Sequence, residues 1–255
     1  MIQPPQSARK ASQSEYSAAL IVIGNEILSG RTQDQNINWI ACKLAEKGIR
    51  FSEVRIVPDI AERVVSAVRE LSARYDYLFT TGGIGPTHDD ITAGCVAQAF
   101  ETPIVENEEA RAMLERHYGG PEHLNPARLK MAQIPRGGTL IPNPVSGAPG
   151  FVIENVYVMA GVPKIMQAML DHVLPGLAGG DVLLSRTVSS RFPESRIALK
   201  LADIQESWPD VEIGSYPQFK DGKFGVSVVL RSANEGMLEA AERDVKKLIA
   251  ELEQG

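Results

Sequence analysis

The chain of 255 residues has only two cysteines, Cys42 and Cys95, and neither belongs to a Cys-x-x-Cys or Cys/His pattern. This argues against a zinc site and predicts two buried free thiols, each inside a helix. The sequence also has no run of 18 apolar residues and no apolar segment of the signal-peptide kind at its N-terminus. We therefore expect a cytoplasmic protein that does not bind membranes.

Basic residues are also fewer than acidic ones. Lys and Arg total 26 against 32 Asp and Glu, which gives a net charge of -6 and a pI near 5.4. Such a balance argues against a nonspecific nucleic-acid or membrane surface. Hydrophobic residues make up 44% of the chain, which is enough for a sizeable core. The length suits one domain of about 150 to 200 residues followed by a smaller one.

The stretch from Tyr77 to Thr92 combines a strand, a glycine loop and the start of a helix. Tyr77–Thr81 is short, apolar and β-branched, which is typical of a buried strand, and Ile91–Phe100 fits a helix. The glycines between them let the chain turn through positive φ and expose backbone N–H groups beside a helix N-terminus, which suits a phosphate. We expect the phosphate to bind the following residues: Thr81, Gly82, Gly83, Gly85 and Thr87.

Two adjacent carboxylates, Asp89 and Asp90, follow the glycine loop. Alone they would repel a phosphate, whereas a divalent metal ion binds both carboxylate and phosphate oxygens. We predict that Asp89 and Asp90 are catalytic and bind Mg²⁺, Mn²⁺ or Co²⁺. Glu26, at the carboxyl end of the apolar strand 18–23, is the expected third metal ligand. The alternative is structural: Asp90 caps the helix, and His88 and Asp89 form a solvated loop.

The segment Thr-Thr-Gly-Gly-Ile-Gly-Pro-Thr-His-Asp-Asp-Ile-Thr (residues 80–92) closely resembles the signature of the molybdopterin-binding, MogA/gephyrin-like family. The form is that of the N-terminal domain of competence/damage-inducible CinA proteins. It is neither a dinucleotide fingerprint nor a Walker loop, because no Gly-Lys-Ser/Thr follows. The family's Gly-Asp-Glu-Leu-Leu and Asp-Thr-Asn segments match at Glu26, Asp34 and Asn36, which otherwise read as polar loop residues and a helix N-cap. Two positions depart from the family: Asn25 and Gln35.

A second irregular loop, residues 143–151, resembles the family's Asn-Pro-Val-Gly-Thr-Ala-Pro-Gly-Phe, with Ser146-Gly147 in place of Gly-Thr. Its N–H groups suit a planar ring or a second phosphate. After an expected strand at 152–159, the chain has Ile165 where relatives have Glu, which implies altered substrate choice or reduced catalysis. The resemblance and the loop chemistry add these expected ligand-binding residues: Asn36, Asn143, Gly147, Gly150 and Gly161.

Strands and helices alternate at short spacing through residues 16–176, which predicts an α/β fold with three layers and a doubly wound, mostly parallel sheet. An Asp-x-x-Glu capping box at Asp59 is expected to start one of its helices. Residues 1–15 are expected to form a disordered arm and 175–180 a linker. A small α+β domain of order β-α-β-β-α is predicted for 181–255, which leaves no room for the amidohydrolase domain of full-length CinA proteins.

For function, the resemblance implies a metal-dependent hydrolase that cleaves the phosphoanhydride bond of ADP-ribose, FAD or a similar nucleotide. One alternative is a module of molybdenum-cofactor metabolism that holds molybdopterin or adenylylates it. The other is a non-catalytic regulatory protein that keeps the fold. In each case the expected ligand is a small nucleotide or a pterin, with no nucleic acid, and we expect a homo-oligomer.

Overall fold

The computed structural model describes residues 15–220 and 223–254. The chain divides into two compact units, with the boundary between Gly180 and Asp181. The boundary lies at the end of the segment expected as a linker. The expected arm at 1–15 lies outside the described residues except for its last position. Asp221-Gly222, a sequence typical of a hairpin turn, lies outside them entirely.

A six-stranded sheet forms the centre of the larger unit, in the order β2-β1-β3-β8-β7-β6. Strands β2, β1, β3 and β8 run parallel, and β7 is antiparallel to both of its neighbours. The mostly parallel sheet predicted from the sequence is therefore confirmed. The strands are β1 (Tyr16–Ile23), β2 (Ile49–Val57), β3 (Tyr77–Thr81), β6 (Thr139–Ile141), β7 (Gly150–Ile153) and β8 (Val156–Met159).

The single strand expected at 152–159 is wrong. The structure has a hairpin there, in which Glu154 and Asn155 make a two-residue loop between β7 and β8. Glu154 has a positive φ of 50°, and the Asn155 amide donates hydrogen bonds to the carbonyls of Ser72 and Tyr75 at 2.9 and 2.8 Å. These two polar residues interrupt the apolar run, and a two-residue loop is what an antiparallel turn needs.

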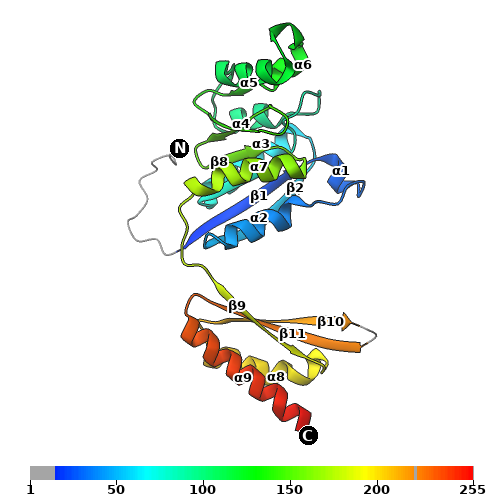
Figure 1. The fold of residues 1–255 in the computed structure, drawn as a ribbon, viewed down its shortest axis with the longest axis vertical. Helices are drawn as coiled ribbons and strands as arrows, with labels where there is room; N and C mark the ends of the chain where they lie inside the picture. The colour runs from blue at the N-terminus through cyan, green and yellow to red at the C-terminus, as the bar shows by residue number, and fades with distance from the viewer. Residues whose placement is uncertain (1–14, 221–222, 255) are drawn as a thin grey trace. The chain divides into compact units, whose positions relative to one another are not determined.

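Helices cover both faces of this sheet and complete the three layers (Figure 1). Helices α2 (Asn36–Ala45) and α7 (Pro163–Val173) pack on one face of the sheet, to which β1 contributes Leu20. The other face, which includes Ile21 of β1, is covered by α3 (Ala61–Arg74), α4 (Thr92–Ala99) and α5 (Glu108–Tyr118). Because β1 is buried on both sides, it reads as a continuous apolar run.

The connection from β3 to β8 is long and carries its own structure. After α4, strand β4 (Ile104–Glu106) pairs antiparallel with β5 (Gln133–Pro135). Between them lie α5, a 3₁₀ turn at Pro121–His123 and the short helix α6 (Pro126–Lys130). Outside this connection, α1 (Asn25–Leu28) follows β1 and a 3₁₀ turn at Leu174–Gly176 follows α7. The connection thus brings residues around 130 next to the glycine loop.

The smaller unit has an antiparallel sheet in the order β10-β11-β9. Two helices pack with it around a core that includes Leu201, Val228 and Leu238. Its elements are β9 (Leu184–Ser190), α8 (Glu194–Ser207), β10 (Glu212–Lys220), β11 (Lys223–Ser232) and α9 (Glu235–Gln254). In neither unit is any described helix both long and apolar enough to cross a bilayer.

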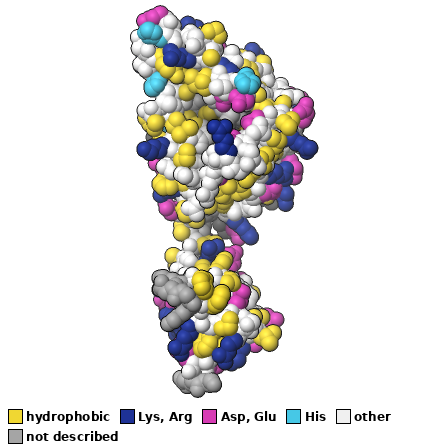
Figure 2. Space-filling model, turned by 90° about the vertical axis from the view of Figure 1, so that its right-hand side faces the viewer, with side chains coloured by type: hydrophobic (Ala, Val, Ile, Leu, Met, Phe, Trp, Pro, Cys, Tyr) yellow, Lys and Arg dark blue, Asp and Glu magenta, His cyan; other side chains and the backbone are white. Residues whose placement is uncertain are grey.

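On the face of the protein seen in Figure 2, acidic and basic side chains are interspersed among hydrophobic and uncharged ones. They do not gather there into a large patch of one sign. The face shown therefore offers no broad basic surface of the kind that nonspecific nucleic-acid binding uses.

The capping box expected at Asp59 is also wrong. Helix α3 begins at Ala61 with Ile60 in the N-cap position and has no side-chain cap. Asp59 lies one residue too early, and its carboxylate instead accepts a 2.9 Å hydrogen bond from the backbone N–H of Asn25. Asp59 is therefore structural, but it secures the start of α1.

The two cysteines differ in exposure, and the expectation that both are buried is wrong for Cys42. The buried side of α2 carries Ile40 and Leu44, and Cys42, midway between them in sequence, points away from that side. Cys95 is only 3% exposed, and burial raises the pKa of its thiol to about 11.

We therefore expect Ellman's reagent at pH 8 to react rapidly with one thiol of the native protein and with two after unfolding. The fast thiol should be Cys42, because it is exposed and Cys95 is both shielded and protonated. A Cys42→Ser variant should lose the fast phase entirely. Equal rates for the two thiols in the native wild type would contradict the structure.

Candidate functional site

A cleft of about 640 Å³ opens at the edge of the sheet where the parallel strands β1, β3 and β8 end. Loops that follow these strands form its walls, which is where open α/β sheets place their ligands. The structure brings together in this cleft nine of the residues predicted from the sequence: Glu26, Gly82, Gly83, Gly85, Thr87, Asp89, Asp90, Asn143 and Gly161.

Gly82 begins the glycine loop in a position that only glycine can occupy. Its φ is +102°, and a Cβ atom built there would lie 2.2 Å from the carbonyl oxygen of Ile23. Its N–H donates to Met159 O at 3.2 Å, so this one residue joins the ends of β1 and β8. The hydroxyl of Thr92, at the start of α4, donates to Gly82 O at 2.9 Å and so fixes the loop to the first turn of the helix.

The next three residues, Gly83, Ile84 and Gly85, line the cleft with their backbone. None of the residues in the described part of the chain accepts a hydrogen bond from their N–H groups. Unpaired N–H groups in series form an anion-binding site, and α4 adds the positive end of its dipole just beyond them. This loop can therefore bind an anion without any basic side chain.

Thr87 contacts the carboxylates of both aspartates. Its N–H and its hydroxyl each lie 2.7 Å from Oδ2 of Asp90, and the same hydroxyl also contacts Oδ1 of Asp89. The hydrogen bond from Thr87 lowers the pKa of Asp89, with smaller contributions that include the nearby charge of Lys130. Because a hydroxyl carries one hydrogen, it can serve only one of the two carboxylates at a time.

Asp90 does not cap helix α4, so the structural alternative for this residue is wrong. Helix α4 begins at Thr92, Ile91 occupies the N-cap position, and no side chain caps the helix. Asp90 folds back onto its own loop instead of forward onto the helix.

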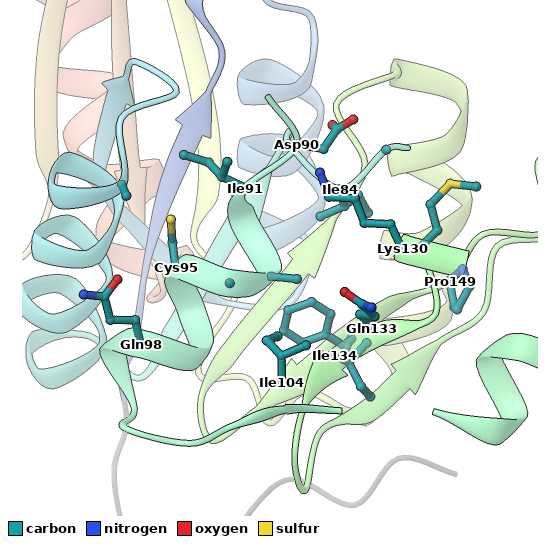
Figure 3. Close-up of a pocket in the computed structure, with 17 residues that line it drawn as sticks. Ile84, Asp90, Ile91, Cys95, Gln98, Ile104, Lys130, Gln133, Ile134 and Pro149 are labelled. Atoms are coloured by element: carbon teal, nitrogen blue, oxygen red, sulfur yellow. The ribbon is translucent and has the colours of Figure 1, made fainter. Parts of the chain in front are cut away.

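Lys130 reaches this loop from the far end of the β3–β8 connection. Its ammonium group contacts the carbonyl oxygen of Thr87, and Figure 3 shows the side chain extending toward the segment that carries Asp90. The sequence marks Lys130, like Asn125 in the same segment, only as a polar residue able to face the site. The structure gives it a definite partner and makes it a positioning residue for the aspartate loop.

Replacing Lys130 by methionine should loosen the loop, because a charge-assisted hydrogen bond contributes about 1.5 to 3 kcal/mol in favourable cases. Hydrogen exchange of the peptide covering 83–92 should become about tenfold faster. Lys200→Met, which removes an exposed ammonium group in the smaller unit, is the matched control and should leave this peptide unchanged. Identical exchange in Lys130→Met and wild type would show that the contact does not hold the loop.

Glu26 lines the cleft, but its carboxylate folds back against Gly24, where its two oxygens lie 2.4 and 2.5 Å from the position of a Cβ atom. Nowhere in the described residues do three or more His, Cys, Asp or Glu side chains form a group that could hold a metal ion. The three-carboxylate set expected from Glu26, Asp89 and Asp90 is therefore not assembled here. The aspartates turn toward Thr87, and Glu26 turns toward Gly24.

Asn36 does not line the cleft but supports one of its loops from behind. It is 3% exposed, and its amide donates to the carbonyl of Gly161 at 2.8 Å, so it ties the start of α2 to the loop after β8. The alternative that Asn36 is the N-cap is wrong, because Gln35 occupies that position and Asn36 is the first residue of the helix. Asp34, one residue before the N-cap, accepts from the Ile37 N–H at 2.8 Å. Thr81 is also buried, and neither it nor Asn36 lines the cleft.

The second glycine loop is held mainly by Asn143. This buried side chain donates to Ser146 Oγ and Ala148 O and accepts from two backbone N–H groups, so its hydrogen bonds stay within the loop. Gly147, with φ of +73°, packs against His117, and Gly150 lies against the carbonyl of Val158 in the β7–β8 pairing. These two glycines shape the backbone and do not line the cleft.

Several cleft residues were not predicted as ligand-binding. Tyr118 lies under the guanidinium of Arg128, 3.9 Å from the ring centroid to Cζ. Asn125, a polar residue that by its sequence position could also face the site, instead caps α6 by accepting from the Arg128 N–H at 2.9 Å. The unpredicted lining residues include Thr32, Ile84, Tyr118, Met131 and Ala148. Apolar residues of this kind have no distinguishing signal, because their sequence spacing is also that of core residues.

A family profile described as "Probable molybdopterin binding domain" matches residues 19–179. The chain belongs to this family. The match covers the six-stranded sheet and its loops except for the first three residues of β1, so the resemblance seen at residues 80–92 extends through nearly all of the larger unit. A second profile, described as "FAD synthase, middle domain", matches residues 182–253, which make up nearly all of the smaller unit.

Relatives of this family member include a protein of Archaeoglobus fulgidus, 35% identical over 78% of this chain and 85% of the relative. A CinA-like protein of Citrifermentans bemidjiense is 40% identical over 74% of this chain but only 45% of its own length. Among solved structures, CinA of Thermoplasma acidophilum is similar with 36% identity and a TM-score of 0.60, covering 63% of this chain and 97% of that one.

Proposed function

We propose that the cleft binds the diphosphate of a small nucleotide and that the protein hydrolyses its phosphoanhydride bond with the help of a divalent metal ion. One observation carries the proposal. The unpaired N–H groups of Gly83, Ile84 and Gly85 lie beside two carboxylates, Asp89 and Asp90, that share a single hydroxyl donor. The N–H groups require an anionic ligand, whereas the carboxylates require a cation. A diphosphate that binds together with a divalent metal ion satisfies both.

The aspartates suit a metal ion that arrives with its substrate. Mg²⁺ is usually bound by one or two carboxylates, with waters and substrate phosphates completing its six ligands. Asp89 and Asp90 supply two such carboxylates. Thr87 offers them only two hydrogens, its N–H to Asp90 and its hydroxyl to one of the two, so most of their oxygen lone pairs stay free for a metal ion. The lowered pKa of Asp89 keeps that group ionised, as a metal ligand must be. Glu26 and Asp59 are two further carboxylates that line the same cleft.

In the proposed reaction, water attacks one phosphorus atom and the bridging P–O bond breaks, so ADP-ribose yields AMP and ribose 5-phosphate. A divalent ion at the aspartates would offset the charge of the diphosphate and acidify a bound water. The amides of the glycine loop bind the phosphate oxygens on which charge develops. The carboxylate that does not receive the hydrogen of the Thr87 hydroxyl, Asp89 or Asp90, orients the water and accepts its proton.

The test uses the purified full-length chain with ADP-ribose or FAD and Mg²⁺, Mn²⁺ or Co²⁺, and measures AMP by chromatography. We expect AMP release that EDTA abolishes and that resumes when the metal is restored. In H₂¹⁸O, one product phosphate should acquire a single ¹⁸O, because hydrolysis takes its new oxygen from water. Absence of AMP with all three metals would refute the hydrolase proposal.

A binding role for molybdopterin is the second candidate, supported by the family's description and by the apolar side of the cleft, which includes Val162 and Ile165. Molybdopterin carries a phosphate next to its pterin ring system, and this phosphate would bind the same glycine loop. This candidate predicts a fluorescent pterin that co-purifies with the protein and can be identified by mass spectrometry after acid release. The same preparation should then release no AMP from either nucleotide.

A further inference from the structure

A second cavity, of about 430 Å³, opens on the other side of the glycine loop, and we call it the side pocket. It shares Gly83, Ile84, Gly85, Asp90 and Met131 with the main cleft. The unpaired N–H groups of the loop therefore lie at the junction of two cavities. A volume in this range is typical of pockets for small organic molecules.

The side pocket lies between α4 and the segment 130–134, with Phe151 among its lining residues (Figure 3). Its lining is mainly apolar: Ile84, Ile91, Ile104, Met131, Ile134 and Phe151. Lys130 and Asp90 lie on the side of the glycine loop, and the amides of Gln98 and Gln133 are its neutral polar groups. An apolar pocket with a few neutral donors and acceptors suits a planar ring that carries nitrogen and oxygen at its edges.

Gly94 is the residue that keeps this pocket open. It belongs to α4 and lines the pocket, and a Cβ atom placed on it would meet no heavy atom within 4 Å. Neither strain nor crowding therefore demands glycine here, and alanine would favour the helix by about 0.8 to 1 kcal/mol. The missing side chain instead leaves free space along the wall of the pocket.

We propose that the side pocket receives the nitrogen heterocycle of one of the two groups that the diphosphate joins, while the other group extends into the main cleft. This inference rests on the proposed function and narrows its substrate class to diphosphates with an organic group at each end. Two cavities that diverge from one anion-binding loop fit a molecule with two arms. The amide of Gln133, which lies on the same side of α4 as Ile104 and Ile134 (Figure 3), is the neutral polar group that can pair with the edge of the ring.

The test fills the pocket with a Gly94→Leu substitution. Binding is measured by calorimetry with Mg²⁺ and non-hydrolysable α,β-methylene analogues of ADP-ribose and FAD, and with inorganic pyrophosphate. Gly94→Leu should weaken binding of at least one two-armed analogue about tenfold and change the affinity for pyrophosphate less than about twofold. Weakening of both would assign the shared adenine to the side pocket, and weakening of the FAD analogue alone would assign the flavin ring to it.

The matched control is Gly236→Leu, which makes the same change on an exposed glycine of α9 in the smaller unit and should leave every affinity unchanged. Thermal unfolding should show both variants folded, since leucine favours a helix over glycine. Unchanged affinity of Gly94→Leu for both analogues would overturn the side-pocket inference while leaving the proposed function intact. Failure of wild type to bind either pyrophosphate or the analogues would overturn both.

Discussion

Replacing Asp90 by asparagine should lower the rate of AMP release from ADP-ribose by at least about a hundredfold, the lower end of what a proton-transfer group contributes. Asparagine has the shape of aspartate, and its carbonyl oxygen can still accept from the N–H of Thr87, now 2.7 Å from Asp90 Oδ2. The loop should therefore keep its conformation. What is lost is a negative charge beside the glycine loop, and with it both metal attraction and a proton acceptor.

The measurement is kcat and KM for AMP release with Mg²⁺, compared with wild type and with Asp203→Asn. Asp203 is an exposed aspartate of α8 in the smaller unit, so this control removes the same charge far from the cleft in sequence. The loss should fall on kcat, and raising the Mg²⁺ concentration should recover only the part due to weaker metal binding. An Asp90→Asn variant with wild-type kcat would remove Asp90 from the chemistry.

The parts of the site that lie close together in sequence could be predicted from it. Strand β3, the glycine turn and the start of α4 span residues 77–92, and each is specified by local chemistry: β-branched residues, glycines at positive φ and a helix-forming segment. The parallel sheet could be predicted for a similar reason. A strand buried on both faces, such as β1, must be apolar along its whole length.

Contacts between distant segments could not be predicted in this way. Lys130 binds the carbonyl of Thr87 from 43 residues away, and Asp59 binds the N–H of Asn25 across 34 residues. No periodicity or motif indicates either of these contacts, and the capping-box pattern at Asp59 predicts a different partner. The same holds for Glu26, whose presence in the cleft follows from the end of β1 but whose orientation depends on the space beside Gly24.

The side pocket illustrates the limit most clearly. Gly94 has the sequence appearance of an ordinary, slightly unfavourable helix residue. Only the structure reveals that a side chain there would extend into free space beside the anion loop. That neither crowding nor a positive φ accounts for this glycine can be recognised only from coordinates.

Replacing Gly82 by alanine should reduce the free energy of unfolding of the larger unit by about 3 kcal/mol or more. A non-glycine residue at this positive φ costs about 1 to 3 kcal/mol in strain. The new Cβ atom would also lie 2.2 Å from the carbonyl oxygen of Ile23, a buried residue of the central strand β1. Forcing that contact apart adds the cost of overpacking, about 1 to 3 kcal/mol.

Urea unfolding followed by tryptophan fluorescence can measure this loss in the larger unit alone. The chain has two tryptophans, and in a Trp208→Phe background only Trp39 of α2 remains to report. Gly137→Ala is the matched control, because Gly137 also has a positive φ, of +86°, but a Cβ atom there meets nothing within 4 Å. In the control, the free energy of unfolding should fall only by the cost of strain at positive φ, without the cost of overpacking. Equal losses in the two variants would mean that the ends of β1 and β3 separate easily, and a loop so loosely held could not keep its amides in position for a phosphate.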